Sequence, residues 1–195
     1  MLKIGLTGGM GSGKTTVSGI FSVLGIPVLY ADDVAKTVMN EDAGLRKSII
    51  GLFGEEAYVN NLLNRRYIAG IVFNDKFKLE QLNALVHPVT IAAADEWAKA
   101  QSSAYVIKEA ALMFESPAAA SLDYIIGVYA PQHLRLQRVM NRDNVSREAV
   151  LARMNNQLDE TIKMKLCDFV IINDEQTAVL PQVLDLHKKF LQMAG

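Results

Sequence analysis

The feature that most constrains this chain is a glycine-rich run near its start. Residues 8–15 read Gly-Gly-Met-Gly-Ser-Gly-Lys-Thr and fit the pattern G-x-x-x-x-G-K-[ST]. The glycines let the backbone turn tightly, so that its N–H groups converge on phosphate oxygens. A strand-like run, residues 2–7, precedes the motif, and helical spacing of apolar residues follows it. The sequence therefore predicts a phosphate-binding loop that opens onto a helix N-terminus.

Two side chains of this loop carry specific chemistry. Lys14 supplies a positive charge for the terminal phosphates of a nucleoside triphosphate, and the hydroxyl of Thr15 is suited to Mg²⁺. The motif indicates nucleotide binding but does not identify an acceptor. We expect the nucleotide to be bound by Gly8, Gly9, Gly11, Ser12, Gly13, Lys14, Thr15 and Thr16.

Four more apolar runs predict the fold: residues 26–30, 105–107, 124–129 and 169–172. Continuous apolar strands that alternate with helices are typical of a parallel sheet covered on both faces. The sequence thus predicts an α/β protein of the P-loop NTPase type, with five parallel strands. The last helix is expected to bury one stripe, made of Leu180, Val183, Leu184, His187 and Leu191.

Two stretches interrupt this alternation. Residues 33–100 show only helix-like patterns, and residues 131–165 form a second helical stretch, which is rich in Arg. We therefore expect a nucleotide-binding core made of residues 1–32, 101–130 and 166–195. Residues 33–100 would be a helical insertion that binds the acceptor, and residues 131–165 a helical lid.

Composition excludes several classes of protein. Twenty Lys and Arg against 21 Asp and Glu, in 195 residues, give no overall attraction for nucleic acid or an anionic membrane. The single cysteine, Cys167, rules out an intramolecular disulfide, and with three histidines it forms no zinc pattern. There is no long apolar run and no secretion-signal pattern. We expect a cytoplasmic monomer or small homo-oligomer, with no membrane or nucleic-acid partner.

The remaining patterns favour a small kinase. No Asp stands three residues before a Gly, and no Asn-Lys-x-Asp is present, so the signatures of a GTPase are missing. No apolar strand ends in the acidic pair of a large mechanical ATPase. A kinase needs a carboxylate near the acceptor, cations for the transferring phosphoryl group, and a means of excluding water.

Two acidic residues follow predicted strands. Asp32 comes just after the second strand, where ligands of open α/β sheets bind, and could accept the proton of an acceptor hydroxyl. Its alternative role is a helix cap. Glu109 follows the third strand and could hold Mg²⁺ through water. Its alternative is a solvated charge at a strand end.

Basic residues supply the cations. Arg135, Arg138 and Arg142 share one face of a predicted helix, where guanidinium groups suit phosphate oxygens. Each one alone could instead be part of a solvated face. On the insertion, Arg65 could meet an acidic acceptor, and His87 could contact a ligand or be structural.

Taken in order, these residues resemble a known family, the dephospho-coenzyme A kinases. Residues 5–16 are similar to the opening of that family, and further elements follow in its order along the whole chain. These elements are Ala31-Asp32, Val86-His87-Pro88, residues 109–115, residues 137–143, Arg153, Gln157, Asp168 and Ile172-Asn173.

The resemblance implies a reaction and roles for residues. The reaction would transfer the γ-phosphate of ATP to the ribose 3′-hydroxyl of dephospho-CoA, with Mg²⁺, as the last step of coenzyme A synthesis. By position, Asp32 would be the base, Lys14 and its loop would hold ATP, and Arg138 and Arg142 would close over the phosphates. The insertion, with Arg65 and His87, would bind the CoA side. Asn173 would lie near the adenine of ATP.

The chain also departs from the family pattern. Tyr30 stands where the family usually has an Asp, Glu109 replaces an Asp, and Ala111 replaces a Pro. Two alternatives stay open at this point. One is another small-molecule or nucleotide kinase of the same fold, and the other is an ATP-binding regulator without catalytic activity.

Overall fold

The computed structural model describes residues 1–115 and 117–195 and divides into two compact units. Unit 1 consists of residues 1–30 and 101–195, and unit 2 of residues 31–100. The elements of unit 1 are β1 (Leu2–Thr7), α1 (Lys14–Val23), β2 (Val28–Tyr30), β5 (Tyr105–Glu109), η2 (Pro117–Ser121), β6 (Tyr124–Tyr129), α6 (Gln132–Asp143), α7 (Arg147–Met154), α8 (Glu160–Lys165), β7 (Phe169–Ile172) and α9 (Val179–Ala194).

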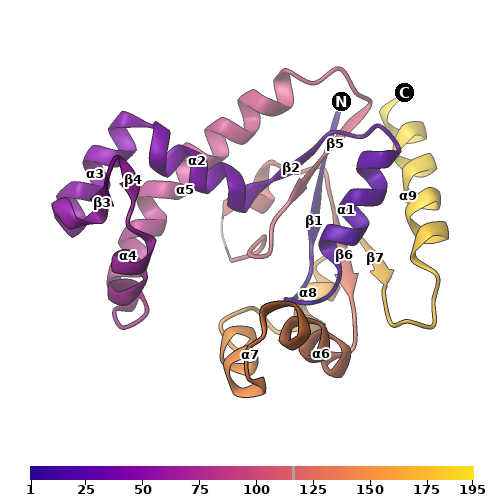
Figure 1. Cartoon of the computed structure of the whole chain (residues 1–195). Coiled ribbons are helices and arrows are strands. Elements are labelled where there is room, and N and C mark those ends of the chain that lie inside the picture. Colours follow the sequence, from indigo (N-terminus) through magenta and orange to yellow (C-terminus); the bar gives the residue numbers. More distant parts are fainter. Residues whose placement is uncertain (116) are drawn as a thin grey trace. The chain divides into compact units, whose positions relative to one another are not determined.

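Unit 1 is built on a five-stranded sheet of order β2-β5-β1-β6-β7, in which every pair is parallel (Figure 1). This confirms the predicted α/β fold. Strand β1 is central, so the glycine-rich loop that follows it emerges from the middle of the sheet's carboxyl edge. In open parallel sheets this edge is where ligands bind.

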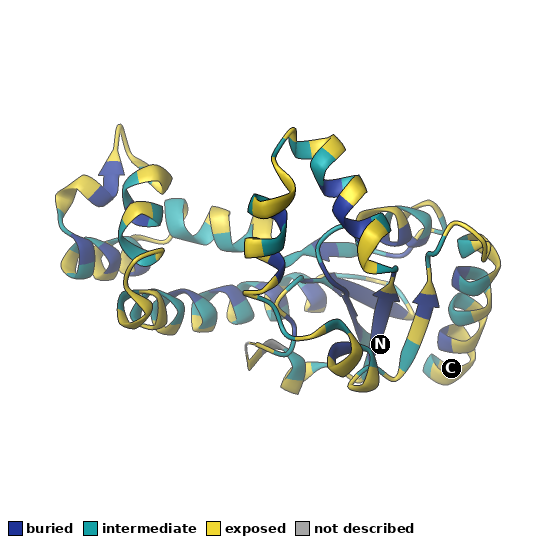
Figure 2. Ribbon diagram, turned by 90° about the horizontal axis from the view of Figure 1, so that it is seen from below, coloured by how far each residue is buried: buried dark blue, intermediate teal, exposed yellow. Residues whose placement is uncertain are grey.

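Successive side chains of each strand point to opposite faces of the sheet, and helices cover both faces. Ile4 and Leu6 of β1, with Ile126 and Val128 of β6, are fully buried in a core shared with α1 and α9. On the opposite face, Gly127 leaves room for α8, because an added Cβ would lie 2.8 Å from the sulfur atoms of Met164 and Cys167. Figure 2 shows these strands as the dark, buried layer of the unit.

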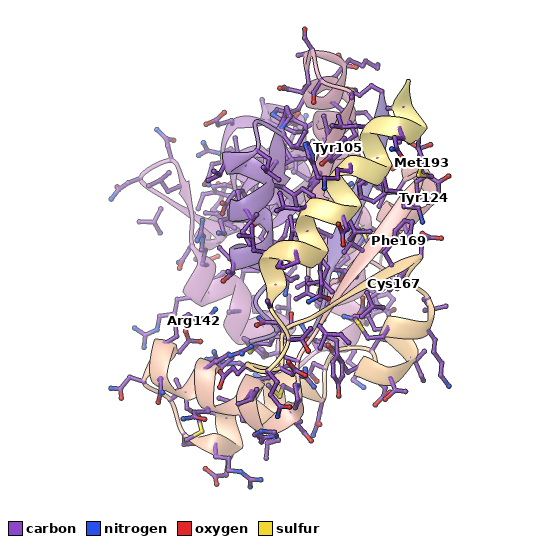
Figure 3. The ribbon with its side chains drawn as sticks, turned by 90° about the vertical axis from the view of Figure 1, so that its right-hand side faces the viewer. Tyr105, Tyr124, Arg142, Cys167, Phe169 and Met193 are labelled. Atoms are coloured by element: carbon purple, nitrogen blue, oxygen red, sulfur yellow. The ribbon has the colours of Figure 1, made fainter. Side chains whose placement is uncertain are left out.

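The last helix buries only part of the predicted stripe, since Leu184 and His187 are half-buried. Leu180 and Leu191 are 52% and 42% exposed, whereas Val183 and Phe190 are fully buried. Phe190 packs against a cluster of rings, with centroids 5.4 Å from Tyr105, 6.3 Å from Tyr124 and 5.4 Å from Phe169, and Figure 3 shows these three residues along α9. The prediction was right for Val183 and wrong for Leu180 and Leu191, because the buried stripe is the neighbouring one made of Val179, Val183, Leu186 and Phe190.

Unit 2 contains α2 (Ala31–Glu41), α3 (Ala43–Phe53), η1 (Glu55–Ala57), β3 (Tyr58–Val59), β4 (Leu62–Leu63), α4 (Arg65–Val72) and α5 (Lys76–Lys99). Its core includes Leu45, Ile49 and Phe53 of α3. The expectation of helices alone was wrong, because β3 and β4 form an antiparallel hairpin. Asn60 and Asn61 form its turn with φ angles of 50° and 66°, which asparagine tolerates.

Candidate active site

The loop between β1 and α1 has the backbone of a phosphate cradle. Gly8, Gly11 and Gly13 have φ angles of 154°, 79° and 98°, and the last two lie well inside the region that favours glycine. A Cβ at Gly8 would lie 2.5 Å from the carbonyl oxygen of Val128, and one at Gly11 would lie 2.5 Å from that of Arg135. These three glycines are therefore needed for both conformation and space.

The charged end of the loop leads into α1. The Lys14 ammonium donates hydrogen bonds to the carbonyl oxygens of Gly8 at 2.9 Å and of Gly9 at 3.4 Å, which hold it over the loop. The first N–H groups of a helix have no partner within the helix and carry a partial positive charge. Thr15 and Thr16 lie exposed in this first turn. The arrangement fits the phosphates of a nucleotide.

Two of the predicted residues contact this loop from elsewhere in unit 1. The side-chain amide of Asn173, just after β7, donates to the carbonyl oxygen of Ser12 at 2.8 Å. Arg138 of α6 donates to the carbonyl oxygens of Gly11 at 3.5 Å and of Asn173 at 3.2 Å, and also pairs with Glu175 at 3.0 Å. The structure thus brings Arg138 and Asn173 to the nucleotide loop, where a base and its phosphates would be expected.

The other two arginines of the predicted face have different surroundings. Arg135 is buried and pairs with Glu160 of α8. Arg142 is 66% exposed and pairs with Asp143 at 2.7 Å, among the helices below the sheet in Figure 3. Its hydrogen bond, together with its charge, lowers the pKa of Asp143 despite the opposing effect of desolvation. The structure does not place Arg142 against the loop, and its role stays a prediction.

Two further residues, Glu160 and Met10, contact the loop or belong to it without having been predicted as site residues. Glu160 accepts a hydrogen bond from the Gly9 N–H, and Gln157 accepts one from the Met10 N–H. Arg135, Gln157 and Glu160 also line a cavity of about 490 Å³ beside the carboxyl end of β6. These contacts join residues about 150 positions apart, so no local pattern could have shown them.

The residues predicted to hold Mg²⁺ have suitable donor chemistry. Glu109 is the last residue of β5 and stands in register with Leu6 of β1 and Tyr30 of β2, and Thr15 presents a hydroxyl at the start of α1. Mg²⁺ takes few protein oxygens and retains water and phosphate ligands. In the described ranges no three His, Cys, Asp or Glu residues gather into a metal cluster, which such a site does not need.

Tyr30, one of the three departures from the family pattern, has a structural role here. Its hydroxyl lies 3.2 Å from that of Ser18 in α1, and Ser18 in turn donates to the carbonyl oxygen of Thr15 at 3.0 Å. Tyr30 therefore connects the end of β2 to the helix that begins at the loop.

Three predicted residues belong to unit 2. Asp32 lies exposed in the first turn of α2, where a carboxylate is favourable to the helix dipole, and its neighbour Asp33 pairs with Lys36 at 2.6 Å. Arg65 is the first residue of α4, after the capping side chain of Asn64. His87 is half-buried in α5, and burial lowers its pKa, so it is neutral near pH 7.

Comparison with known proteins decides the family. The family model described as dephospho-CoA kinase matches residues 2–178. The chain belongs to the dephospho-CoA kinase family. A dephospho-CoA kinase of Bacteroides fragilis is 37% identical over 186 residues, covering 95% of this chain and 91% of the relative. One of Salinibacter ruber is 40% identical over 178 residues, covering 89% of each.

Solved structures with the same fold include a dephospho-CoA kinase. A crystal structure from Thermus thermophilus is 34% identical with a TM-score of 0.84, over 98% of this chain and 97% of that one. The dephospho-CoA kinase of Campylobacter jejuni is 27% identical with a TM-score of 0.71, over 99% and 98%. The family resemblance predicted from the sequence is confirmed, and the phosphate loop is that of a kinase that uses ATP. Within residues 1–115 and 117–195, no helix has both the length and the apolar character to cross a membrane.

Proposed function

We propose that the protein transfers the γ-phosphoryl group of ATP to the ribose 3′-hydroxyl of dephospho-CoA, giving coenzyme A and ADP. This is the last step of coenzyme A synthesis. The single observation that carries the proposal is the family match over residues 2–178. The conformation of the glycine-rich loop supports it, because that loop presents backbone N–H groups and Lys14 to phosphate oxygens.

Asp32 is the proposed general base. It lies two residues beyond the end of β2, and β2 runs parallel to the strands from which the loop emerges. A carboxylate there would accept the proton of the 3′-hydroxyl as that oxygen attacks the γ-phosphorus, while ADP leaves on the opposite side. Such a base typically contributes about 10²–10⁴-fold to the rate.

Positive charge would stabilise the transferring group. Lys14 is held at the loop, and Arg138 reaches it from α6. Arg142 would join them when the lid, residues 131–165, closes over the phosphates. Thr15 would hold Mg²⁺ directly and Glu109 through water, and the bound ion would neutralise charge on the phosphate oxygens.

Unit 2 would bind the acceptor, and Asn173 of unit 1 would lie near the adenine of ATP. Arg65 would meet the negative charge of dephospho-CoA. Because His87 is neutral near pH 7, it would act by hydrogen bonding rather than by charge. We propose that the protein works in the cytoplasm as a monomer or small homo-oligomer, with no nucleic-acid or membrane partner.

The test is ADP release from Mg-ATP across a panel of acceptors: none, dephospho-CoA, nucleoside monophosphates and shikimate. Of these acceptors, we expect only dephospho-CoA to raise the rate of ADP release well above the rate without acceptor. Release that depends instead on another acceptor would replace the proposed substrate while leaving the kinase fold unaffected.

A further inference from the structure

We propose that Glu160, together with Gln157, is a positioning residue that sets the first half of the phosphate loop for phosphoryl transfer. The proposal rests on the use of ATP by this loop and not on the identity of the acceptor. We call Arg135, Gln157 and Glu160 the loop clamp.

The clamp binds the loop through its backbone. The N–H of Gly9 donates to Glu160 Oε1 at 3.3 Å, and the N–H of Met10 donates to Gln157 Oε1 at 3.1 Å. Two successive N–H groups of the loop therefore have acceptors that come from within this chain. The part left for phosphate oxygens is residues 11–15 and the N-terminus of α1.

An ion pair holds the clamp itself in place. Arg135 and Glu160 approach to 3.4 Å, and their side chains are only 10% and 11% exposed. Pairs shielded from water in this way are fixed more firmly than surface pairs. Gly9 packs against both, because an added Cβ would collide with Arg135 NH1 and Glu160 Oε2. Position 9 is open to any residue in the general motif, but here the clamp requires glycine.

The side chain of Met10 anchors the same stretch of loop. It packs against an apolar cluster of α6 and α7 that comprises Leu136, Val139, Val150 and Met154. Next to it, a Cβ at Gly11 would lie 2.9 Å from Val139 Cγ2. The loop is thus fastened at positions 9, 10 and 11 to the segment that was predicted to be a lid.

These contacts favour positioning over imitation of a phosphate. If Glu160 merely occupied the place of a phosphate, neither the neutral amide of Gln157 nor the apolar anchor of Met10 would be needed beside it. A fixed loop matters most in the transition state, where an error of about 1 Å in position can lower the rate about 10²-fold. Ground-state binding would still be supported by Lys14 and the N-terminus of α1.

The first experiment compares Glu160→Ala with Glu148→Ala, a matched change at an exposed glutamate of α7. The measurements are kcat and KM for ATP with dephospho-CoA, and the Kd of a non-hydrolysable ATP analogue. We expect Glu160→Ala to lower kcat by at least about tenfold while KM and Kd change by less than about threefold. Glu160→Gln, which retains an acceptor for the Gly9 N–H, should recover part of kcat.

A second pair of variants decides the matter if Glu160→Ala fails to fold. Gly9→Ala displaces the Arg135–Glu160 pair while retaining both side chains, and Gly19→Ala is its control, because nothing lies within 4 Å of a Cβ there. The same loss of kcat is expected for Gly9→Ala only.

Two results for Glu160→Ala would overturn the proposal: an unchanged kcat, whether or not KM rises, or tighter binding of the analogue. The last would make Glu160 a competitor of phosphate. Binding of the analogue and slow ATP hydrolysis need no acceptor, so they test the clamp even if dephospho-CoA is not the substrate.

Discussion

Replacing Lys163 by Met should destabilise unit 1, whereas the same replacement of a surface lysine should not. The side chain of Lys163 is completely buried in α8, and its ammonium donates to the carbonyl oxygen of Ala111 at 3.0 Å. It also pairs with Glu115 at 3.2 Å, and Glu115 accepts from the Leu158 N–H at 2.9 Å. This network connects the segment after Glu109 to α8, so its loss affects the neighbourhood of the proposed site.

The magnitude follows from these contacts. Leaving the Ala111 carbonyl without its donor costs about 1–2 kcal/mol. Losing the partner of Glu115, whose side chain is 24% exposed, adds about 1 kcal/mol, and release of the ammonium from burial offsets part of this. Met fills nearly the same volume, so no cavity forms. We expect a net loss of about 2 kcal/mol and, at about 2–4 °C per kcal/mol for a chain of this size, a Tm lower by about 4–8 °C.

Acid titration gives an independent check on the same network. Burial alone would raise the pKa of Glu115, but the Leu158 N–H and the charge of Lys163 outweigh it and lower the pKa below 4.5. A lowered folded-state pKa contributes stability above pH 4.5 that is lost as pH falls through the folded-state value. The difference in stability between wild type and Lys163→Met should therefore become smaller in acid.

Calorimetry of wild type, Lys163→Met and the exposed control Lys165→Met measures this effect. A Tm within 1 °C of wild type for Lys163→Met, or an equal loss of Tm for both variants, would show that the buried network of Lys163 does not stabilise unit 1. Adding Glu115→Gln to Lys163→Met should recover part of the stability, because no uncompensated charge then remains.

Three further predictions concern single side chains. Asp32→Asn should lower kcat by about 10²-fold or more while leaving ATP-analogue affinity nearly unchanged, whereas Asp33→Asn should not; equal turnover of the two variants would remove the base assignment. Burial, with the charge of Asp168 beside it, raises the pKa of the Cys167 thiol to about 12. At pH 8, iodoacetamide should therefore modify the native protein at least about 100-fold more slowly than the urea-unfolded protein. Equal rates of modification would contradict this. Burial lowers the pKa of His87 below its usual 6.5, so just below pH 6.5 the unfolded state binds more protons than the folded state. The free energy of unfolding should therefore fall as pH drops through this range. In His87→Asn this part of the pH dependence, measured by urea unfolding, should disappear.

The sequence was sufficient for elements whose reasons are local. The glycines at positions 8, 11 and 13 predict the loop, because its positive φ angles and the lack of space for a Cβ require glycine there. The five strands could be predicted because each contains a short apolar run, and the inner strands β1, β5 and β6 are mostly buried. The hairpin at Asn60-Asn61 also had a local signal, since adjacent asparagines favour turns with positive φ.

Other features depend on contacts between distant residues. The last helix, α9, carries two overlapping apolar stripes, and only the rings from three strands that surround Phe190 select the stripe that is buried. Glu160 meets Gly9 across 151 positions, and Lys163 meets Ala111 across 52. The three arginines of α6 look equivalent by spacing, yet the structure buries Arg135, brings Arg138 to the loop and leaves Arg142 exposed.

The most direct test of the proposed reaction is to identify the product formed from dephospho-CoA and Mg-ATP, by mass and by phosphorus NMR. We expect one ADP for each acceptor consumed, and a product heavier by one phosphoryl group that is bonded to the ribose 3′-oxygen. ATP binding without any dephospho-CoA-dependent ADP, or a phosphoryl group on another oxygen, would contradict it.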